Sequence, residues 1–142
     1  MKRTVAILTV SGFLLSVAYA TVGAQATKSV NDGVYTADQA KLGEALYKEQ
    51  CSACHGDNLE GSGPMPPLAG KDFLANWQGK TVGDLFEKTQ TTMPATAPGT
   101  LTPEMTANIV SYMLSKDNYP AGAAALESKM EPLLQIKLDA PK

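Results

Sequence analysis

The sequence predicts an all-α fold with three to five helices. Three stretches combine a helix start signal with apolar residues at helical spacing. No stretch shows the alternation of apolar and polar residues that is typical of a half-buried strand. Segments rich in glycine and proline separate the helical stretches, so long loops carry much of the chain. A chain of 142 residues fits one domain.

The first helix is predicted to start at Thr36, because Thr36 and Gln39 have the spacing of a capping box. It runs towards Cys51 and carries apolar residues at helical spacing, namely Leu42, Leu46 and Tyr47. Residues 27–35, which precede this helix, are expected to form a flexible lead-in.

Two more helices are predicted further along the chain. One starts at Thr81 and ends near Gln90. The other starts at Thr102, where a cap residue is followed by a proline in the first turn. Its apolar residues lie on one side, namely Met105, Ile109, Val110, Met113 and Leu114. The connecting segments are expected to be loops, namely residues 56–70 and 91–101.

The pattern weakens beyond Pro120. Residues 123–130 are interpreted as a short helix, and the last dozen residues as extended chain. We therefore place the main domain at residues 36–120 and a C-terminal extension at residues 121–142.

Residues 1–26 have the features of a cleaved signal peptide. Lys2 and Arg3 precede an apolar stretch, residues 5–18, which small-residue cleavage patterns follow. Cleavage after Ala26 is preferred, because it leaves a polar stretch before the cut; cleavage after Ala20 is the alternative. An uncleaved membrane anchor is the competing interpretation, but the apolar stretch is short for a span of about 20 residues. We expect a periplasmic protein with no stable membrane insertion after cleavage.

The charge of the chain excludes one class of partner. No run of Lys or Arg indicates a nucleic-acid surface. Removal of residues 1–26 leaves 10 basic residues against 14 acidic ones, a formal charge of −4. This balance weakly favours a partner protein with a basic docking patch.

The motif with the clearest chemistry is Cys51-Ser52-Ala53-Cys54-His55. Two cysteines at this spacing, followed directly by a histidine, are the pattern of covalent haem attachment. The two sulfurs bond the vinyl groups on one porphyrin edge, and the histidine binds the iron. A structural zinc site needs about four Cys or His ligands, and the whole chain has three such residues. A thioredoxin-like pair would need a strand before a helix, which the flanking sequence lacks.

A second axial ligand is expected among the methionines, because His55 is the only histidine. The sixth position is then held by methionine, a weaker side chain, water or nothing. Met93 is the best candidate, since it lies in a loop between two predicted helices and precedes a proline. Met65 is the competitor, although it follows His55 closely in the sequence. Core packing is the simpler interpretation of Met105 and Met113.

Over residues 37–116 the chain resembles the class I c-type cytochromes. This resemblance implies a small fold around one covalent haem c, attached through the two cysteines. It also implies that Gly43 and Tyr47 on the first helix contact Ile109 and Tyr112 on the last. A glycine inside a helix costs about 1 kcal/mol against alanine, which is consistent with a close approach of two backbones there.

The resemblance extends to a proline loop, Pro66-Pro67-Leu68-Ala69-Gly70. In the family, a proline carbonyl in this loop accepts a hydrogen bond from the second nitrogen of the axial histidine and fixes its tautomer. Pro66 is our choice for this role, with Pro67 as the alternative.

A narrower resemblance is to the cytochrome domains and subunits that serve pyrroloquinoline-quinone dehydrogenases. It rests on these motifs: Leu68-Ala69-Gly70, Phe73-Leu74, Trp77, Gly79-Lys80-Thr81, Leu85-Phe86, Thr92-Met93-Pro94, Pro98-Gly99 and Tyr119-Pro120-Ala121-Gly122. Trp77 is then expected at the haem edge or a propionate, with a plain core tryptophan as the alternative. Residues 126–142 fall outside both resemblances.

These observations lead to an electron carrier that transforms no substrate. His55 and Met93 would be the iron ligands, while Cys51, Cys54, Pro66 and Trp77 would complete the haem site. The expected partners are redox proteins: an exported dehydrogenase as donor and a respiratory acceptor. The alternatives are a cytochrome subunit bound tightly to a quinoprotein alcohol dehydrogenase and, further off, a haem sensor or a peroxidase-like enzyme.

Overall fold

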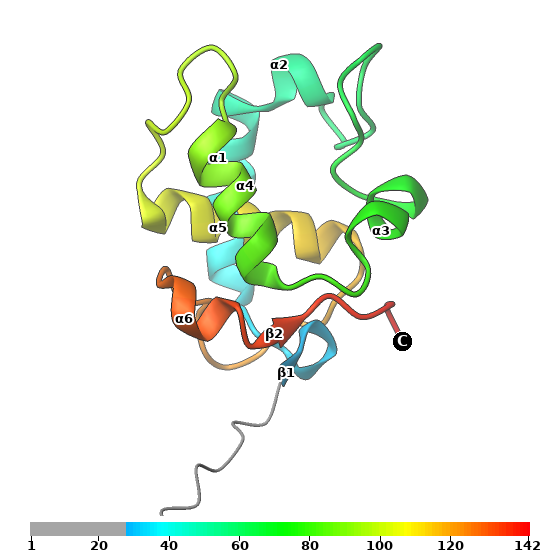
Figure 1. The fold of residues 1–142 in the computed structure, drawn as a ribbon, viewed down its shortest axis with the longest axis vertical. Helices are drawn as coiled ribbons and strands as arrows, with labels where there is room; N and C mark the ends of the chain where they lie inside the picture. The colour runs from blue at the N-terminus through cyan, green and yellow to red at the C-terminus, as the bar shows by residue number, and fades with distance from the viewer. Residues whose placement is uncertain (1–27) are drawn as a thin grey trace, which may run out of the picture.

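The computed structural model describes residues 28–142, so the predicted signal peptide lies outside the described residues. The all-α fold class is confirmed, with one very small parallel sheet added (Figure 1). In chain order the elements are β1 (Lys28–Ser29), the 3-10 helix η1 (Val30–Asp32), α1 (Ala37–Gln50), α2 (Ser52–His55), α3 (Lys71–Trp77), α4 (Val82–Thr92), α5 (Pro103–Lys116), α6 (Met130–Leu133) and β2 (Ile136–Lys137).

The three long helices are those that the capping signals predict. The hydroxyl of Thr36 accepts a hydrogen bond from the Gln39 backbone N–H at the start of α1. Thr81 and Asp84 form a complete capping box at α4, and Thr102 caps α5. The predicted end of α4 near Gln90 is two residues short, because its last turn continues to Thr92.

Helices α1 and α5 pack against each other more extensively than any other pair among the described residues. They approach closely at Gly43, where a Cβ atom would overlap the backbone carbonyl of Asn108. The rings of Tyr47 and Tyr112 stack nearby with centroids 5.4 Å apart, and Ile109 is buried. The helix crossing that the resemblance implies is therefore present. It forms one wall of the core.

Helix α3 was not predicted, because residues 71–77 make fewer than two turns and begin without a side-chain cap. The expected helix over residues 123–130 is wrong. Residues 123–125 are exposed and offer no apolar face, and the main chain of Leu126 bonds instead to the side-chain amide of Gln39. The helix in this region is α6, which starts at Met130.

The described part of the expected flexible lead-in is packed against the domain. Strand β1 pairs in parallel with β2, and the side chains of Val30 and Tyr35 are buried. The Tyr35 hydroxyl donates to the carbonyl of Tyr119 at 2.6 Å. No strand was predicted here, because the pairing joins segments about a hundred residues apart and leaves no local signal.

The C-terminal extension returns across the molecule and becomes part of the core. Leu133, Ile136 and Leu138 are buried, and α6 packs on α4. In Figure 1 this segment lies with β1 at the opposite end of the molecule from α2. The main chain of Leu138 bonds to Gly79 and Lys80, so the extension also holds the connection between α3 and α4.

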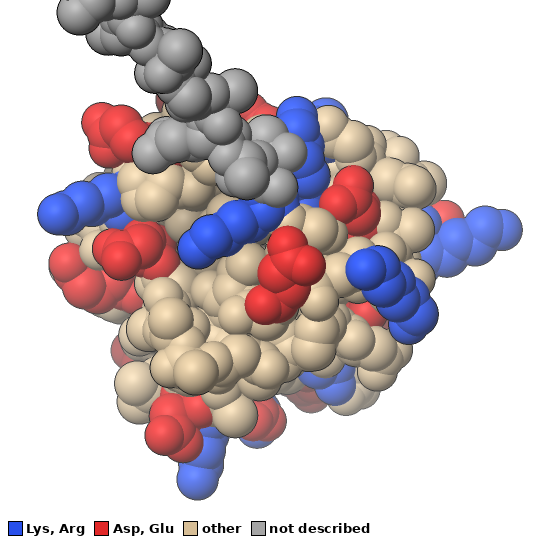
Figure 2. Space-filling model, turned by 90° about the horizontal axis from the view of Figure 1, so that it is seen from below, with Lys and Arg blue, Asp and Glu red and all other residues tan. Residues whose placement is uncertain are grey.

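The lower face of the molecule carries both signs of charge. Figure 2 shows lysines interspersed with acidic side chains over the described part of this face. A mixed surface does not attract a partner of one sign strongly. Between residues 28 and 142, no helix combines the length and apolar character of a membrane span.

Candidate functional site

The Cys-X-X-Cys-His motif lies at the junction of two helices. Cys51 ends α1, and the short helix α2 carries Cys54 and His55. Cys51 is half-buried and Cys54 is exposed, and neither is in a disulfide. As a free thiol, Cys51 has its pKa raised to about 11 by burial, with a smaller contribution from Cys54.

His55 is buried, and its ring is oriented by the proline loop. Nδ1 lies 2.8 Å from the carbonyl oxygen of Pro66, the contact that the resemblance implies. A carbonyl can only accept, so Nδ1 carries a proton, and Nε2 is the nitrogen left to offer a lone pair in the neutral ring. A neutral imidazole with this tautomer is ready to bind a metal through Nε2.

The loop that supplies this carbonyl is held by its own backbone. Gly61 N–H donates to the carbonyl of His55 at 2.8 Å, and Leu68 N–H donates to Leu59 at 2.8 Å. On the other side, the Tyr47 hydroxyl donates to the carbonyl of Gly56 at 2.6 Å and ties α1 to the end of α2. Burial is the main cause that raises the pKa of Tyr47, so the phenol stays a donor.

Within the described residues, the structure does not provide the surroundings that a thioredoxin-like pair or a structural zinc site needs. The pair follows a helix, whereas a thioredoxin-like pair follows a strand. In the part of the chain that the structure describes, no group of three or more His, Cys, Asp or Glu side chains is arranged to hold a metal ion.

The candidate methionines differ in their surroundings. Met93 is partly buried at the C-terminal cap of α4, where the backbone becomes extended. Met65 lies in an exposed turn, and its side chain is 37% exposed. Met113 is buried in the core and Met105 packs against it, as core packing requires.

The end of α4 before Met93 is uncharged but saturated with hydrogen bonds. The hydroxyls of Thr89, Thr91 and Thr92 each donate to the carbonyl four residues earlier, at 2.7–2.8 Å. These bonds tie the threonine side chains to the backbone of their own helix.

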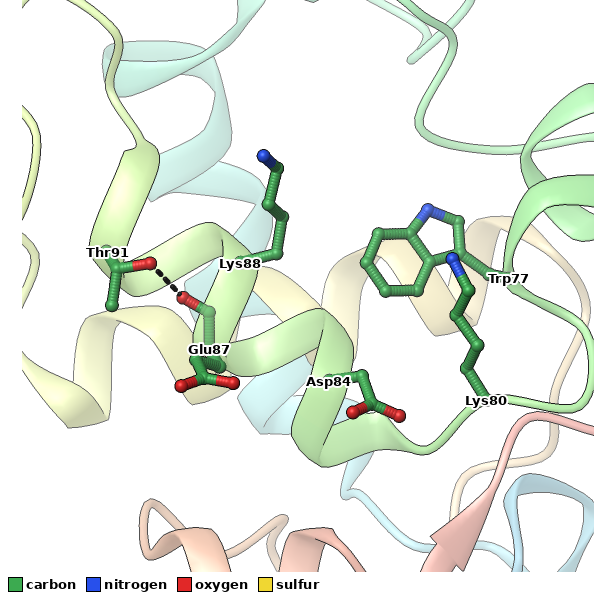
Figure 3. A pocket seen from close by; sticks show the side chains of 6 residues that line it. All are labelled: Trp77, Lys80, Asp84, Glu87, Lys88 and Thr91. Atoms are coloured by element: carbon green, nitrogen blue, oxygen red, sulfur yellow. Dashed lines mark hydrogen bonds between the residues drawn. The ribbon is translucent and has the colours of Figure 1, made fainter.

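Trp77 lines a cleft of about 580 Å³ between α3 and α4. Trp77 is partly buried and packs against the core cluster. The ammonium of Lys80 lies 4.6 Å from the ring centroid. Figure 3 shows the ring extending from α3 towards α4, with Lys88 on the facing helix. Lys88 was not predicted, since one lysine on an exposed helix carries no signal.

Asp117 is a second residue that the sequence did not reveal. It follows α5, yet its side chain is buried, and Oδ1 accepts from the backbone N–H of Gly70 at 2.6 Å. Its Oδ2 is buried without a hydrogen-bond partner among the described residues. An acidic residue at the end of a helix is ordinarily solvated, so the sequence offers no sign of this contact.

We predict that Asp117→Asn raises the stability of the protein at pH 7. Burial raises the pKa of Asp117 more than the Gly70 hydrogen bond lowers it, so the folded protein binds its proton more tightly than the unfolded chain does. The charge therefore costs free energy above the folded pKa, and this cost disappears as pH falls through that pKa. Urea unfolding of both proteins at pH 7 and about pH 4 checks this. If the difference in unfolding free energy between the two proteins does not narrow at the lower pH, the prediction is contradicted.

Comparison with known proteins identifies the family. Residues 38–113 match the family model described as cytochrome C oxidase, cbb3-type, subunit III. The chain is 43% identical over 75 residues to cytochrome c-551 of Bacillus subtilis, covering 50% of this chain and 66% of that protein. It is 33% identical over 91 residues to the cbb3-type cytochrome c oxidase subunit CcoP of Rubrivivax gelatinosus. This match covers 61% of this chain and 29% of that protein. The chain thus spans less than two thirds of each relative.

A solved structure has the same fold. The sulfane dehydrogenase SoxCD of Paracoccus pantotrophus matches with a TM-score of 0.53 and 25% identity, over 70% of this chain and 52% of that one. The site fits the cofactor of the family, because two unpaired thiols lie beside an imidazole whose Nδ1 is engaged. One haem c is attached covalently through Cys51 and Cys54. The chain belongs to the cbb3-type subunit III family of c-type cytochromes and is a class I monohaem cytochrome.

Proposed function

We propose that this protein is a periplasmic electron carrier whose haem iron is held by His55 and Met93. The observation that carries the proposal is the 2.8 Å contact between His55 Nδ1 and the Pro66 carbonyl. It orients the imidazole and increases its basicity, as a permanent axial ligand requires. The bound haem supplies one-electron chemistry between ferrous and ferric iron.

Met93 is the proposed sixth ligand, because it is partly buried at the end of a helix whose threonine hydroxyls bond to the helix backbone. A thioether favours ferrous iron and raises the reduction potential. Two protein ligands leave no open position, which disfavours oxygen chemistry and suits electron transfer. Trp77 is proposed to contact the haem edge or a propionate from the cleft between α3 and α4.

The proposed donor is an exported dehydrogenase, and the proposed acceptor belongs to the respiratory chain. A second candidate function is that of a cytochrome subunit held permanently by a dehydrogenase, such as a quinoprotein alcohol dehydrogenase. The narrower sequence resemblance favours it, and so does the likeness to a structure that is itself named a dehydrogenase. Copurification of a larger subunit from the native source, with haem reduction on addition of alcohol, would support the second candidate. A lone cytochrome would support the first.

The axial ligand is tested by optical spectroscopy of protein produced with the haem-attachment machinery. We expect a low-spin spectrum with a sulfur-to-ferric-iron band and no response to carbon monoxide. Met93→Ala should abolish the band and allow carbon monoxide to bind, because it opens the sixth position. Met65→Ala is the matched control and should leave the spectrum unchanged.

Two outcomes would reject the proposed ligation. If Met65→Ala abolishes the band and Met93→Ala does not, the ligand is Met65. If the unaltered protein is high-spin or binds carbon monoxide readily, the sixth position is open. A haem sensor or a peroxidase-like enzyme then replaces the electron carrier.

A further inference from the structure

Helix α3 is the least firmly packed of the helices beside the proposed haem site. It is absent from the helix pairs that pack extensively among the described residues. In Figure 1 it stands apart from α1 and α4, on the side of the molecule where α5 ends. Phe73 is its one buried side chain, and Trp77 is only partly buried. The position of α3 therefore depends both on these few side chains and on how its two ends are attached.

Each end of α3 is attached to a distant part of the chain. At the C-terminal end, Gly79 N–H donates to the carbonyl of Leu138, and Leu138 N–H donates to the carbonyl of Lys80, both at 2.9 Å. At the N-terminal end, Gly70 has no side chain to serve as a cap. The attachment there is the bond from Gly70 N–H to Asp117 Oδ1, which crosses 47 residues of sequence.

A buried carboxylate such as that of Asp117 is an unusual acceptor for the hydrogen bond that holds the start of α3. Its side chain is buried, and among residues 28–142 Oδ2 has no hydrogen-bond partner. The one ion pair within the same residues lies elsewhere, between Lys48 and Glu44. The charge of Asp117 acts on one titratable neighbour, Tyr119. Burial is the main cause that raises the pKa of Tyr119 to about 12, and the charges of Asp117 and Asp139 raise it further. An uncompensated buried carboxylate costs stability, and its hydrogen bond to Gly70 offsets only part of that cost.

The segment that Asp117 holds carries two residues of the site. Pro66, four residues before Gly70, orients His55, and Trp77, seven residues after it, lines the cleft facing α4. The inner part of the loop is fixed by its own bonds, such as Leu68 N–H to Leu59. Asp117 thus acts mainly on Gly70 and on α3 beyond it.

We propose that Asp117 is a positioning residue for the haem site: its carboxylate joins α5 to Gly70 and so holds α3, with Trp77, against the cofactor. This inference rests on the proposed function only in placing Trp77 beside the haem. It requires that loss of the acceptor at residue 117 moves α3 outwards while the rest of the fold, centred on α1 and α5, stays intact.

The fluorescence of Trp77 tests the proposal, because Trp77 is the only tryptophan and haem quenches nearby tryptophan emission. In the folded holoprotein, Asp117→Ala should raise this emission severalfold. Asp117→Asn should leave it near the original level, since an amide oxygen can still accept from Gly70 N–H. Gln39→Ala is the matched control: it removes a buried side chain of α1 that bonds twice to Leu126 and makes no hydrogen bond to α3, so it should lower stability without changing the emission.

The reduction potential gives a second readout. Asp117→Ala and Asp117→Asn remove the same charge. The difference between their reduction potentials therefore measures the effect of losing the hydrogen bond from Gly70 N–H. We expect the potential of Asp117→Asn to differ from that of Asp117→Ala, which a purely electrostatic role would not produce.

Equal emission and equal potentials in folded Asp117→Ala and Asp117→Asn would overturn the proposal. If Asp117→Ala does not fold, Asp117→Glu serves instead, since it keeps the charge but displaces the acceptor by one methylene. Unchanged emission in that variant would also overturn it. Failure of the proposed function has a separate signature, carbon monoxide binding by the unaltered protein, which does not depend on residue 117.

Discussion

A chain that ends after Lys129 is expected to lose its native fold. The missing residues include Leu133, Ile136 and Leu138, which are 0%, 6% and 2% exposed. Loss of a buried leucine or isoleucine side chain costs about 2–5 kcal/mol. Three such losses together approach the whole stability of a domain this size, about 5–15 kcal/mol. Loss of β2 also leaves β1 without its partner.

Urea unfolding followed by far-ultraviolet circular dichroism would measure this effect. A chain ending after Ala140 is the matched control, because it lacks only Pro141 and Lys142 and keeps every buried side chain of the extension. Leu133→Ala alone should cost about 2–5 kcal/mol. An unchanged unfolding midpoint in the chain that ends after Lys129 would show that the extension is dispensable for the fold.

Gly43→Ala is expected to destabilise the protein by about 2 kcal/mol or more. Helix propensity alone predicts the opposite, a gain of about 1 kcal/mol. The added Cβ, however, would overlap the Asn108 carbonyl oxygen and lie 3.0 Å from the Cβ of Tyr112. Because the obstacle is mainly backbone, no side-chain rotation relieves it, and α1 and α5 must move apart.

Ala45→Gly is the control for Gly43→Ala, since Ala45 is exposed on the same helix. It should cost about 1 kcal/mol, the propensity difference without any change in packing. The unfolding free energies of both variants would be compared with that of the original chain. A stabilised Gly43→Ala protein would mean that the two helices tolerate a wider separation than the structure has.

The sequence predicts those parts of the fold that have local signals. Thr36, Thr81 and Thr102 each mark the start of a long helix, and all three starts are correct. The family resemblance predicts the close helix crossing at Gly43, and a glycine inside a helix is consistent with it, since glycine is unfavourable there unless space is short. The haem-attachment motif is likewise local, because its three functional residues lie within five positions.

The rest depends on contacts between segments that are distant in sequence. The predicted capping box at Thr36 is only half formed, because the Gln39 side chain bonds to Leu126 rather than to the start of its own helix. Strand β1 and the buried Val30 exist only because the extension returns to them. Asp117 could not be distinguished from a solvated acid. Each of these features requires the tertiary fold, which no short window of sequence contains.

The pairing of β1 with β2 makes this domain suitable as a cassette for protein engineering. Lys28 lies beside Ile136 in that sheet, so the two ends of the packed unit meet at one place. This place is at the opposite end of the molecule from α2 in Figure 1. Domains with adjacent ends tolerate insertion into a host loop or circular permutation. A host protein joined at both ends would therefore leave α2, which carries Cys54 and His55, free, so this electron-transfer unit could be grafted onto an enzyme or an electrode anchor.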